Sequence, residues 1–236
     1  MTAVDYLPAL RRQDDLLAST AEGHLDRAVP SCPGWQLGDL VWHVGIVHMF
    51  WTMVATGDLS GPDAWAEPDR PDRGHLITWF RAAVDRSGTV LDGLDPDNPA
   101  WTWGRQQNVR FIRRRLVQET AVHLWDAVNA VGRDEPIDHS VAADGIDEFV
   151  DEVLPHLSQD LGGPPQTICL RARDAGDWTV VAGDGSCTAT RARADAVVSG
   201  TASDLLLLLW GRRTPEQLAV DGDTVALQRF LARGRV

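Results

Sequence analysis

The chain has 236 residues, of which 44% are hydrophobic and 24% are charged, proportions typical of a globular protein and not of a disordered or fibrous one. Its 34 acidic and 22 basic residues give a formal net charge of −12. This charge argues against a partner made of nucleic acid and against an anionic membrane surface, because both would repel an acidic protein. All the basic residues are Arg and none is Lys, a bias typical of a GC-rich coding genome.

Cysteine usage and the apolar segments favour a cytoplasmic protein. Cys32, Cys169 and Cys187 make an odd number and contain no CxxC pair, so a disulfide framework is not indicated. The opening residues MTAVDYLPALRRQDD are too polar for a signal peptide. The longest apolar stretch, residues 41–55, falls short of the about 20 apolar residues that cross a bilayer. We therefore expect no transmembrane segment.

Apolar residues at helical spacing predict four helices in the first half of the chain. The expected helices cover residues 6–23, about 36–56, 75–94 and about 109–131. A Pro-, Gly- and Asp-rich stretch at 57–74 is typical of a long surface loop. Gly132 follows the fourth helix, at a position where glycine is favoured. Four helices of this length predict an up-and-down bundle, in which sites are built from side chains on facing helices.

The second half of the chain predicts a small α+β domain. An acidic helix is expected at about 141–157, and short β-like runs follow between Asp and Gly turns. The predicted strands are QTICLRA, WTVVAG, SCTATRA, AVVSG and LAVDGD, with helices at ASDLLLLLWGRR and TVALQRFLARG. The expected domains are a bundle at 1–132, a linker with a connecting helix at 133–158, and an α+β domain at 159–236.

Two of the four helices carry titratable residues on the face that should be buried. On the fourth helix, Glu119 and His123 interrupt an apolar stripe about 80° wide at 100° per residue. On the second helix, His43 lies at the centre of a stripe about 120° wide. Burying a titratable group is costly unless a partner compensates it, so these three residues are candidates for a functional site.

The spacing of these residues suits a metal. Glu119 and His123 stand at i and i+4 on one helix, and a facing His43 could complete three ligands around one point. Two histidines and one carboxylate leave coordination positions open, as a catalytic Zn²⁺ or a non-haem Fe²⁺ requires. Asp126 lies one turn beyond His123, about 60° round the helix, and could accept a hydrogen bond from the free imidazole nitrogen of a ligand.

Structural roles for the same residues stay open on spacing alone. Glu119 could pair with Arg115 on a solvated face, and His43 and His123 could be hydrogen-bonded core histidines. The run from Arg113 to Arg115 is itself typical of a solvated helix face.

Other polar and aromatic residues are better explained by structure. His48 points about 140° away from His43 around the helix, so we interpret it as structural or exposed. Cys32, between two prolines, could be a nucleophile, but no histidine near it in sequence supplies a base, and a packing role is favoured. Five tryptophans are interpreted as core anchors and not as a cofactor-binding group: Trp35, Trp42, Trp51, Trp125 and Trp210.

Three segments carry a family resemblance that covers nearly the whole chain. They are VPSCPGWQLGDLVWHVG at 29–45, RRRLVQETAVHLWDA at 113–127 and DAVVSGTASDLLLLLWGR at 195–212. In this order, PGW with a histidine eight residues later, a distant ExxxH and GTASDLL…WGR resemble the mycothiol-dependent maleylpyruvate isomerase family. The resemblance implies an α+β fold, with a DinB-type four-helix bundle and a small sterol-carrier-like domain that helps to close the site.

The resemblance also implies a chemistry. The positions matching His43, Glu119 and His123 would hold a divalent metal, usually zinc, whose open position binds the thiol of mycothiol and lowers its pKa. The thiolate would add to the double bond of a cis-enedioic substrate, allow rotation, and leave the trans isomer. An arginine would clamp a substrate carboxylate; Arg212 of the WGR segment is the candidate, and the adjacent Arg213 is the alternative.

Mycothiol and a small-molecule electrophile are therefore the expected partners, and the chain is expected to be a monomer or a homodimer. The lack of Lys suits an actinobacterium, in which mycothiol is the main small thiol. A mycothiol S-transferase acting on another electrophile is the alternative enzyme, because a scaffold predicts thiol activation better than it predicts the electrophile. A metal-bearing or ligand-binding protein without turnover is the alternative from another class.

Overall fold

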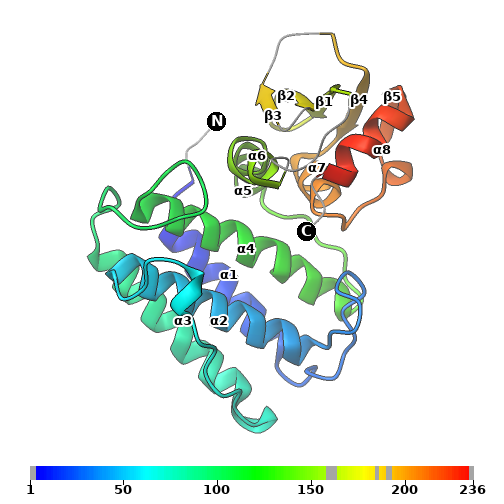
Figure 1. Cartoon of the computed structure of the whole chain (residues 1–236). Coiled ribbons are helices and arrows are strands. Elements are labelled where there is room, and N and C mark those ends of the chain that lie inside the picture. The colour runs from blue at the N-terminus through cyan, green and yellow to red at the C-terminus, as the bar shows by residue number, and fades with distance from the viewer. Residues whose placement is uncertain (1–3, 158–163, 184–185, 190–192, 234–236) are drawn as a thin grey trace. The chain divides into compact units, whose positions relative to one another are not determined.

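The computed structural model describes residues 4–157, 164–183, 186–189 and 193–233. The chain forms two compact units, Val4–Glu135 and Pro136–Val236. In Figure 1 the first unit runs from blue to green and the second from green to red.

The first unit is a bundle of four long helices, as predicted (Figure 1). They are α1 (Tyr6–Ala21), α2 (Leu37–Thr56), α3 (Leu76–Gly93) and α4 (Val109–Ala130). The predicted surface loop between α2 and α3 contains two short 3₁₀ turns, Pro62–Ala64 and Arg73–His75.

The starts of α2 and α4, which carry the candidate site, are fixed by side-chain caps. At α2, Gln36 and Asp39 form a reciprocal capping box. At α4, the side chain of Asn108 accepts a hydrogen bond from the backbone N–H of Phe111 over 3.1 Å. Such caps satisfy backbone donors that the first helical turn leaves unpaired. Because the caps set where each helix begins, they set which face every later residue occupies.

The packing gives the order of the helices around the bundle. Helix α1 packs against α3 and α4, and α2 packs against the same two helices, whereas α1 and α2 touch each other less. Helices α1 and α2 therefore lie across a diagonal, and the linker between them crosses the end of the bundle. The pair α2 and α4, which carries the three site candidates, is in direct contact.

His48 is fully buried in this bundle. Its Nε2 lies 3.3 Å from Thr120 Oγ1 and 3.4 Å from Asp14 Oδ1. Burial lowers the pKa of His48 to about 3, although the negative charge of Glu119 acts in the opposite direction. The imidazole is thus neutral at physiological pH, and of the two interpretations of His48 the structural one is confirmed.

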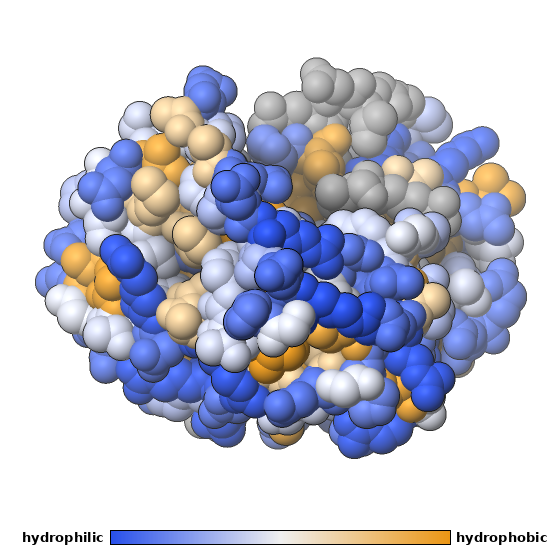
Figure 2. All heavy atoms as spheres, turned by 90° about the horizontal axis from the view of Figure 1, so that it is seen from below, coloured by the Kyte–Doolittle hydropathy of each residue, from blue (hydrophilic) through white to orange (hydrophobic). Residues whose placement is uncertain are grey.

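Helix α2 is long and apolar enough to span a membrane by length and composition, but 61% of its most apolar window is buried inside the protein. The apolar residues of α2 are therefore explained by the bundle core, where Leu40, Val41 and Val44 are fully buried. The face of the molecule in Figure 2 is mostly hydrophilic, with apolar residues in small separate groups.

The second unit combines helices with a five-stranded mixed sheet, so the predicted α+β fold is confirmed. Its helical part begins with α5 (His139–Glu148), a π-helical turn (Phe149–Val153) and α6 (Leu154–Leu157). The remaining elements are β1 (Gln166–Ala172), β2 (Asp177–Gly183), β3 (Ser186–Ala189), β4 (Ala196–Gly200), α7 (Ala202–Leu209), β5 (Ala219–Gly222) and α8 (Thr224–Arg233).

The strands lie in the order β3-β2-β1-β4-β5. Strand β1 pairs antiparallel with β2 and parallel with β4, and the other neighbours are antiparallel. Helices α7 and α8 both pack against β1 and β4, and α5 packs against α7. The Leu205–Leu209 run of α7 is almost wholly buried, which explains its uninterrupted leucines. The last part of the predicted SCTATRA strand, residues 190–192, and the side chain of Cys187 lie outside the described residues.

Candidate metal centre

Helices α2 and α4 bring three predicted site residues together. His43 on α2 and Glu119 and His123 on α4 each offer a ligand atom, and these atoms lie within 4.8 Å of one another. The Nε2 atoms of His43 and His123 lie 3.1 and 3.2 Å from the same oxygen, Glu119 Oε1. The i, i+4 spacing on α4 places Glu119 and His123 on one face. Their role as metal ligands stays a prediction.

The second oxygen of Glu119 is held by Arg115, one turn earlier on α4. Arg115 Nη2 donates to Glu119 Oε2 over 3.2 Å. Burial alone would raise the pKa of Glu119, but hydrogen bonds from His123 and His43, together with the charges of His123 and Arg115, lower it well below its usual range. Glu119 is therefore a carboxylate at neutral pH.

The prediction that Arg113 to Arg115 form a solvated face is wrong for Arg115, which is only 4% exposed. Three consecutive helical residues point about 100° apart, so they cannot all occupy one solvent-facing stripe. Arg113 is part-buried as well, and its Nη2 donates to the backbone carbonyls of Leu91 and Leu94.

Asp126 lies against the ring of His123, where its spacing predicted a hydrogen-bond acceptor, and its role in orienting a metal ligand stays a prediction. His123 Nδ1 lies 2.9 Å from Asp126 Oδ2, and Asp126 is fully buried. Burial by itself would lower the pKa of His123, but Asp126, Cys32 and Glu119 raise it well above its usual value. A hydrogen bond from Nδ1–H to a carboxylate leaves Nε2 as the atom that faces Glu119 and a metal.

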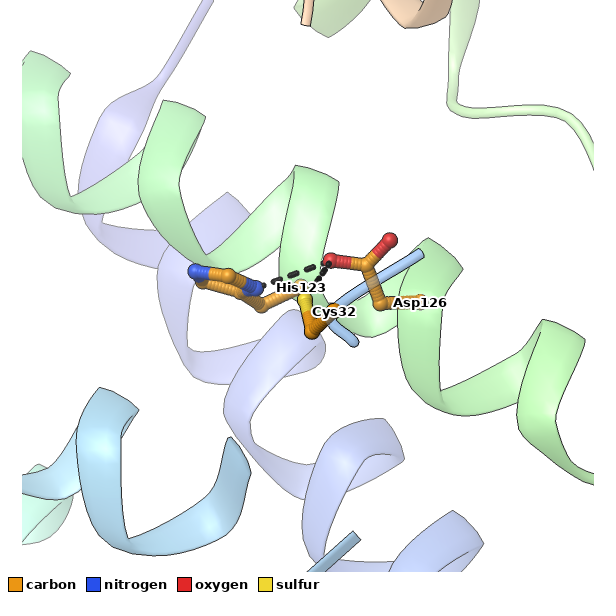
Figure 3. Close-up of side chains that lie close together, drawn as sticks. All are labelled: Cys32, His123 and Asp126. Carbon is orange, nitrogen blue, oxygen red and sulfur yellow. Dashed lines mark hydrogen bonds and ion pairs between the residues drawn. The ribbon is translucent and has the colours of Figure 1, made fainter. Parts of the chain in front are cut away.

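The loop between α1 and α2 also reaches this site. Ser31 Oγ donates to Asp126 Oδ1 over 2.5 Å, and Cys32 Sγ lies 3.7 Å from Asp126 Oδ2. Figure 3 shows the thiol of Cys32 and the ring of His123 approaching the same carboxylate oxygen. The ring of Trp35 lies 5.1 Å from that of His43 and 6.4 Å from that of His123, measured between centroids. The sequence alone predicts none of these three loop residues at the site.

One side of the cluster is open to solvent. The side chain of His43 is 32% exposed and that of Glu119 is 22% exposed, compared with 11% for His123. Catalytic metal sites leave a coordination position accessible, whereas structural sites are closed by four protein ligands.

The residues present fit a divalent metal. Two ligands bound at 2.0–2.1 Å to a tetrahedral Zn²⁺ are about 3.3 Å apart, close to the 3.1 and 3.2 Å between the histidine nitrogens and Glu119 Oε1. Two imidazoles and one carboxylate suit zinc and non-haem iron alike. Asp126 and Arg115 supply the outer hydrogen bonds that such ligands need.

The arginine predicted to bind substrate belongs to the second unit and follows α7. Arg212 Nη1 donates to the carbonyl of Trp210 over 2.8 Å, and Arg213 Nε lies 3.6 Å from Asp204 Oδ1. Both side chains are half-buried. Neither contact distinguishes Arg212 from Arg213 as a carboxylate clamp, and this role stays a prediction.

Known structures share the fold of the chain. A crystal structure of the mycothiol-dependent maleylpyruvate isomerase matches with a TM-score of 0.65 and 12% sequence identity, and the match covers 94% of this chain and 96% of the other. A crystal structure of a histidine-to-alanine mutant of that isomerase matches equally well. No curated protein matches the sequence.

The family is established by two domain matches in chain order. The mycothiol maleylpyruvate isomerase N-terminal domain matches residues 6–128, which span α1 to α4 and contain all three candidate ligands. The corresponding C-terminal domain matches residues 140–229, which span the sheet and its helices. The chain therefore belongs to the mycothiol maleylpyruvate isomerase family.

Proposed function

We propose that the protein is a metal-dependent enzyme that uses mycothiol to isomerise a small cis-enedioate, as maleylpyruvate isomerase does. The observation that carries this proposal is the convergence of His43, Glu119 and His123 on one accessible point. Family membership supports mycothiol as the thiol, and the donor set supports a divalent metal, of which zinc is our choice.

The chain's own groups would hold and shape such a centre. A divalent metal bound there would supply the positive charge that keeps a thiol ionised near neutral pH. His43 and His123 would bind through Nε2 and Glu119 through Oε1, while Arg115 keeps Oε2 occupied. Asp126 would keep the imidazole of His123 in the correct tautomer.

The proposed reaction consumes no thiol. The thiolate of mycothiol adds to one alkene carbon, so that a C–S bond forms and the π electrons move toward the adjacent carbonyl. The former double bond is then single and rotates. When the electron pair returns, the double bond forms again, the C–S bond breaks, and the trans isomer leaves with the thiolate regenerated.

Substrate orientation requires a group that recognises a carboxylate, and we assign this role to Arg212. A guanidinium binds a carboxylate through two parallel hydrogen bonds, which fixes both position and direction. Arg213 is the neighbouring alternative.

The proposal is tested by following both substrate and thiol in one assay. With maleylpyruvate and mycothiol, NMR should show the trans isomer at a constant concentration of free thiol. Glutathione should support much slower turnover, because thiol acidification does not distinguish thiols whereas pocket contacts do. Removal of the metal should abolish turnover, and Zn²⁺ should restore it.

Three other results would contradict the proposal. Stoichiometric loss of thiol with a stable adduct would identify an S-transferase. Metal binding without turnover across a panel of enoates and quinones would identify a binding protein. Equal rates with both thiols would exclude a mycothiol-specific site.

A further inference from the structure

We infer that Ser31 and Cys32, in the loop between α1 and α2, are positioning residues that hold Asp126 and thereby aim His123 at the metal. The inference rests on the metal centre proposed above. It assigns a role to the SCPGW segment beyond connecting two helices.

The first observation is the donor set around Asp126. This carboxylate is fully buried, and burial of an ionised carboxylate is costly unless hydrogen bonds compensate it. Ser31 Oγ approaches Oδ1 at 2.5 Å, whereas His123 Nδ1 at 2.9 Å and Cys32 Sγ at 3.7 Å approach Oδ2. Because both oxygens accept hydrogen bonds, the plane of the carboxylate is fixed. Donors to Oδ2 alone would leave the carboxylate free to rotate.

The second observation is the set of backbone hydrogen bonds within the loop itself. The N–H of Val29 donates to the carbonyl of Trp35, the N–H of Cys32 to that of Val29, and the N–H of Trp35 to that of Cys32, all over 2.9–3.1 Å. The ring of Trp35 stacks on that of His123 with an interplanar angle of 24°. The loop therefore supports the His123 ring in two ways. Ser31 and Cys32 hold its partner Asp126, and the ring of Trp35 packs against the imidazole itself.

The direction of the Cys32 thiol excludes a simpler role as a nucleophile facing substrate. In Figure 3 the sulfur points to the Asp126 carboxylate, on the Nδ1 side of the His123 ring. The open side of the site lies at His43 and Glu119, beyond Nε2. A thiol in this position donates to Asp126, as a weaker counterpart of the Ser31 hydroxyl.

Cys32, His123 and Asp126 also satisfy the distance criterion for a metal cluster of their own. A metal there would have to displace the protons through which His123 and Cys32 contact Asp126. The two roles differ in stoichiometry, because a positioning role needs one metal per chain and a second site needs two.

The experiment titrates Co²⁺ into metal-free full-length protein against a chelator and records the visible spectrum of the bound ion. Ser31→Ala and Cys32→Ala should weaken Co²⁺ binding by about 10- to 100-fold, the usual effect of removing an outer hydrogen bond. Their spectra should shift because the His123 ring is less constrained. Ser31→Thr should bind Co²⁺ with an affinity within about threefold of that of wild type, since it keeps the hydroxyl.

Matched controls separate positioning from general damage. Ser19 is exposed and bonds only to a backbone carbonyl of its own helix among the contacts described, and Cys169 is buried in β1 of the second unit. Ser19→Ala and Cys169→Ala should therefore bind Co²⁺ like wild type. Cys32→Ser, which replaces a weak donor by a stronger one, should bind at least as tightly as wild type, and this holds even where Cys32→Ala fails to fold.

Several outcomes would overturn the inference. Unchanged affinity and spectrum in both Ser31→Ala and Cys32→Ala would remove the loop from the metal centre while leaving the proposed function intact. Weaker binding by Cys32→Ser would contradict the donor role. Two ions per chain, with one lost in Cys32→Ala, would make Cys32 a ligand. No binding by wild type would defeat the proposed function as well.

Discussion

Arg115 and Glu119 form an ion pair one helical turn apart on α4, with Arg115 Nη2 3.2 Å from Glu119 Oε2. Because the guanidinium occupies this oxygen, only Oε1 is directed at His43 and His123. A carboxylate held in this way would bind a metal through one oxygen and leave room for a thiol. Arg115 is thus a buried residue of α4 that also sets which oxygen of Glu119 faces the proposed metal.

Replacing Arg115 by Met should weaken both the fold and the metal site. Glu119 would lose the cationic partner of its Oε2 atom, and we expect a loss of about 1–3 kcal/mol in unfolding free energy, less than for a fully buried pair because Glu119 is partly exposed. Metal affinity should fall by about tenfold or more. Urea unfolding and Zn²⁺ titration measure the two effects.

Arg110→Met is the matched control for this variant. Arg110 lies on the same helix but is half exposed, where it pairs with Asp97. Its loss should leave stability nearly unchanged, because an exposed ion pair contributes little, and should leave metal binding intact. If Arg115→Met behaved like Arg110→Met, the support of Glu119 by Arg115 would be disproved.

His48→Ala should keep its metal, because His48 faces the bundle core and not the cluster. Stability should fall by about 2 kcal/mol or more through the cavity. The folded-state pKa of His48, about 3, lies below the unfolded value of about 6.5. The stability that depends on a neutral His48 is therefore present above pH 6.5 and is lost as pH falls toward 3. The slope is at most about 1.4 kcal/mol per pH unit.

The pH effect is read from urea unfolding of wild type and His48→Ala at pH 7, 6 and 5. Wild type should lose more stability than the variant over this range. If stability fell equally with pH in both proteins, His48 would not be held neutral in the fold. Loss of metal from the variant would show that the metal binds on the His48 face of α2 and not on the His43 face.

Arg212→Ala should lower kcat/KM for a carboxylate substrate by about 1.5–3 kcal/mol in transition-state terms, the usual contribution of a charge-assisted hydrogen bond. Metal content should not change. Arg213→Ala is the parallel variant, and steady-state kinetics of both identify which guanidinium binds substrate. Undiminished turnover in both would remove the carboxylate clamp from the account.

A chain ending after Glu135 should fold and bind metal without catalysing isomerisation. The bundle is a compact unit that contains all three candidate ligands, whereas the proposed clamp lies in the other unit, so thiol activation would survive and substrate positioning would be lost. Circular dichroism, metal analysis and the isomerase assay check the three statements. Full turnover by the truncated chain would contradict this division of labour.

Local patterns were sufficient to predict most of the fold. The predicted helices agree with α1 to α4 to within a few residues at each end, because apolar spacing reports directly on a buried helix face. The strands were found because their β-branched runs are bounded by Asp and Gly turns. The diagonal placement of α1 and α2 was not predicted, because an up-and-down bundle usually places consecutive helices side by side and the actual order depends on contacts between helices.

The site residues also divide into those that local spacing predicts and those that only the fold brings together. The convergence of Glu119 and His123 follows from i, i+4 spacing. His43 was found as a polar residue within an apolar stripe, but the prediction that this stripe is the buried face of α2 is wrong, because His43 is part-buried and the buried face is that of Val44 and His48. Ser31 and Cys32 lie 95 and 94 residues from Asp126 along the chain, so no local pattern connects them. The burial of Arg115 was missed because a run of three arginines is usually solvated, although its pairing with Glu119 was visible in the spacing.

The most direct test of the account is metal content per chain, measured by elemental analysis of purified wild type and of His43→Ala, Glu119→Ala and His123→Ala. His24→Ala is the control, because His24 is exposed and its ring bonds to the backbone carbonyl of Thr20 near the end of α1. Wild type and His24→Ala should carry about one divalent ion per chain, and each ligand variant should lose most of it. Wild-type metal content in any of the three ligand variants would contradict the account.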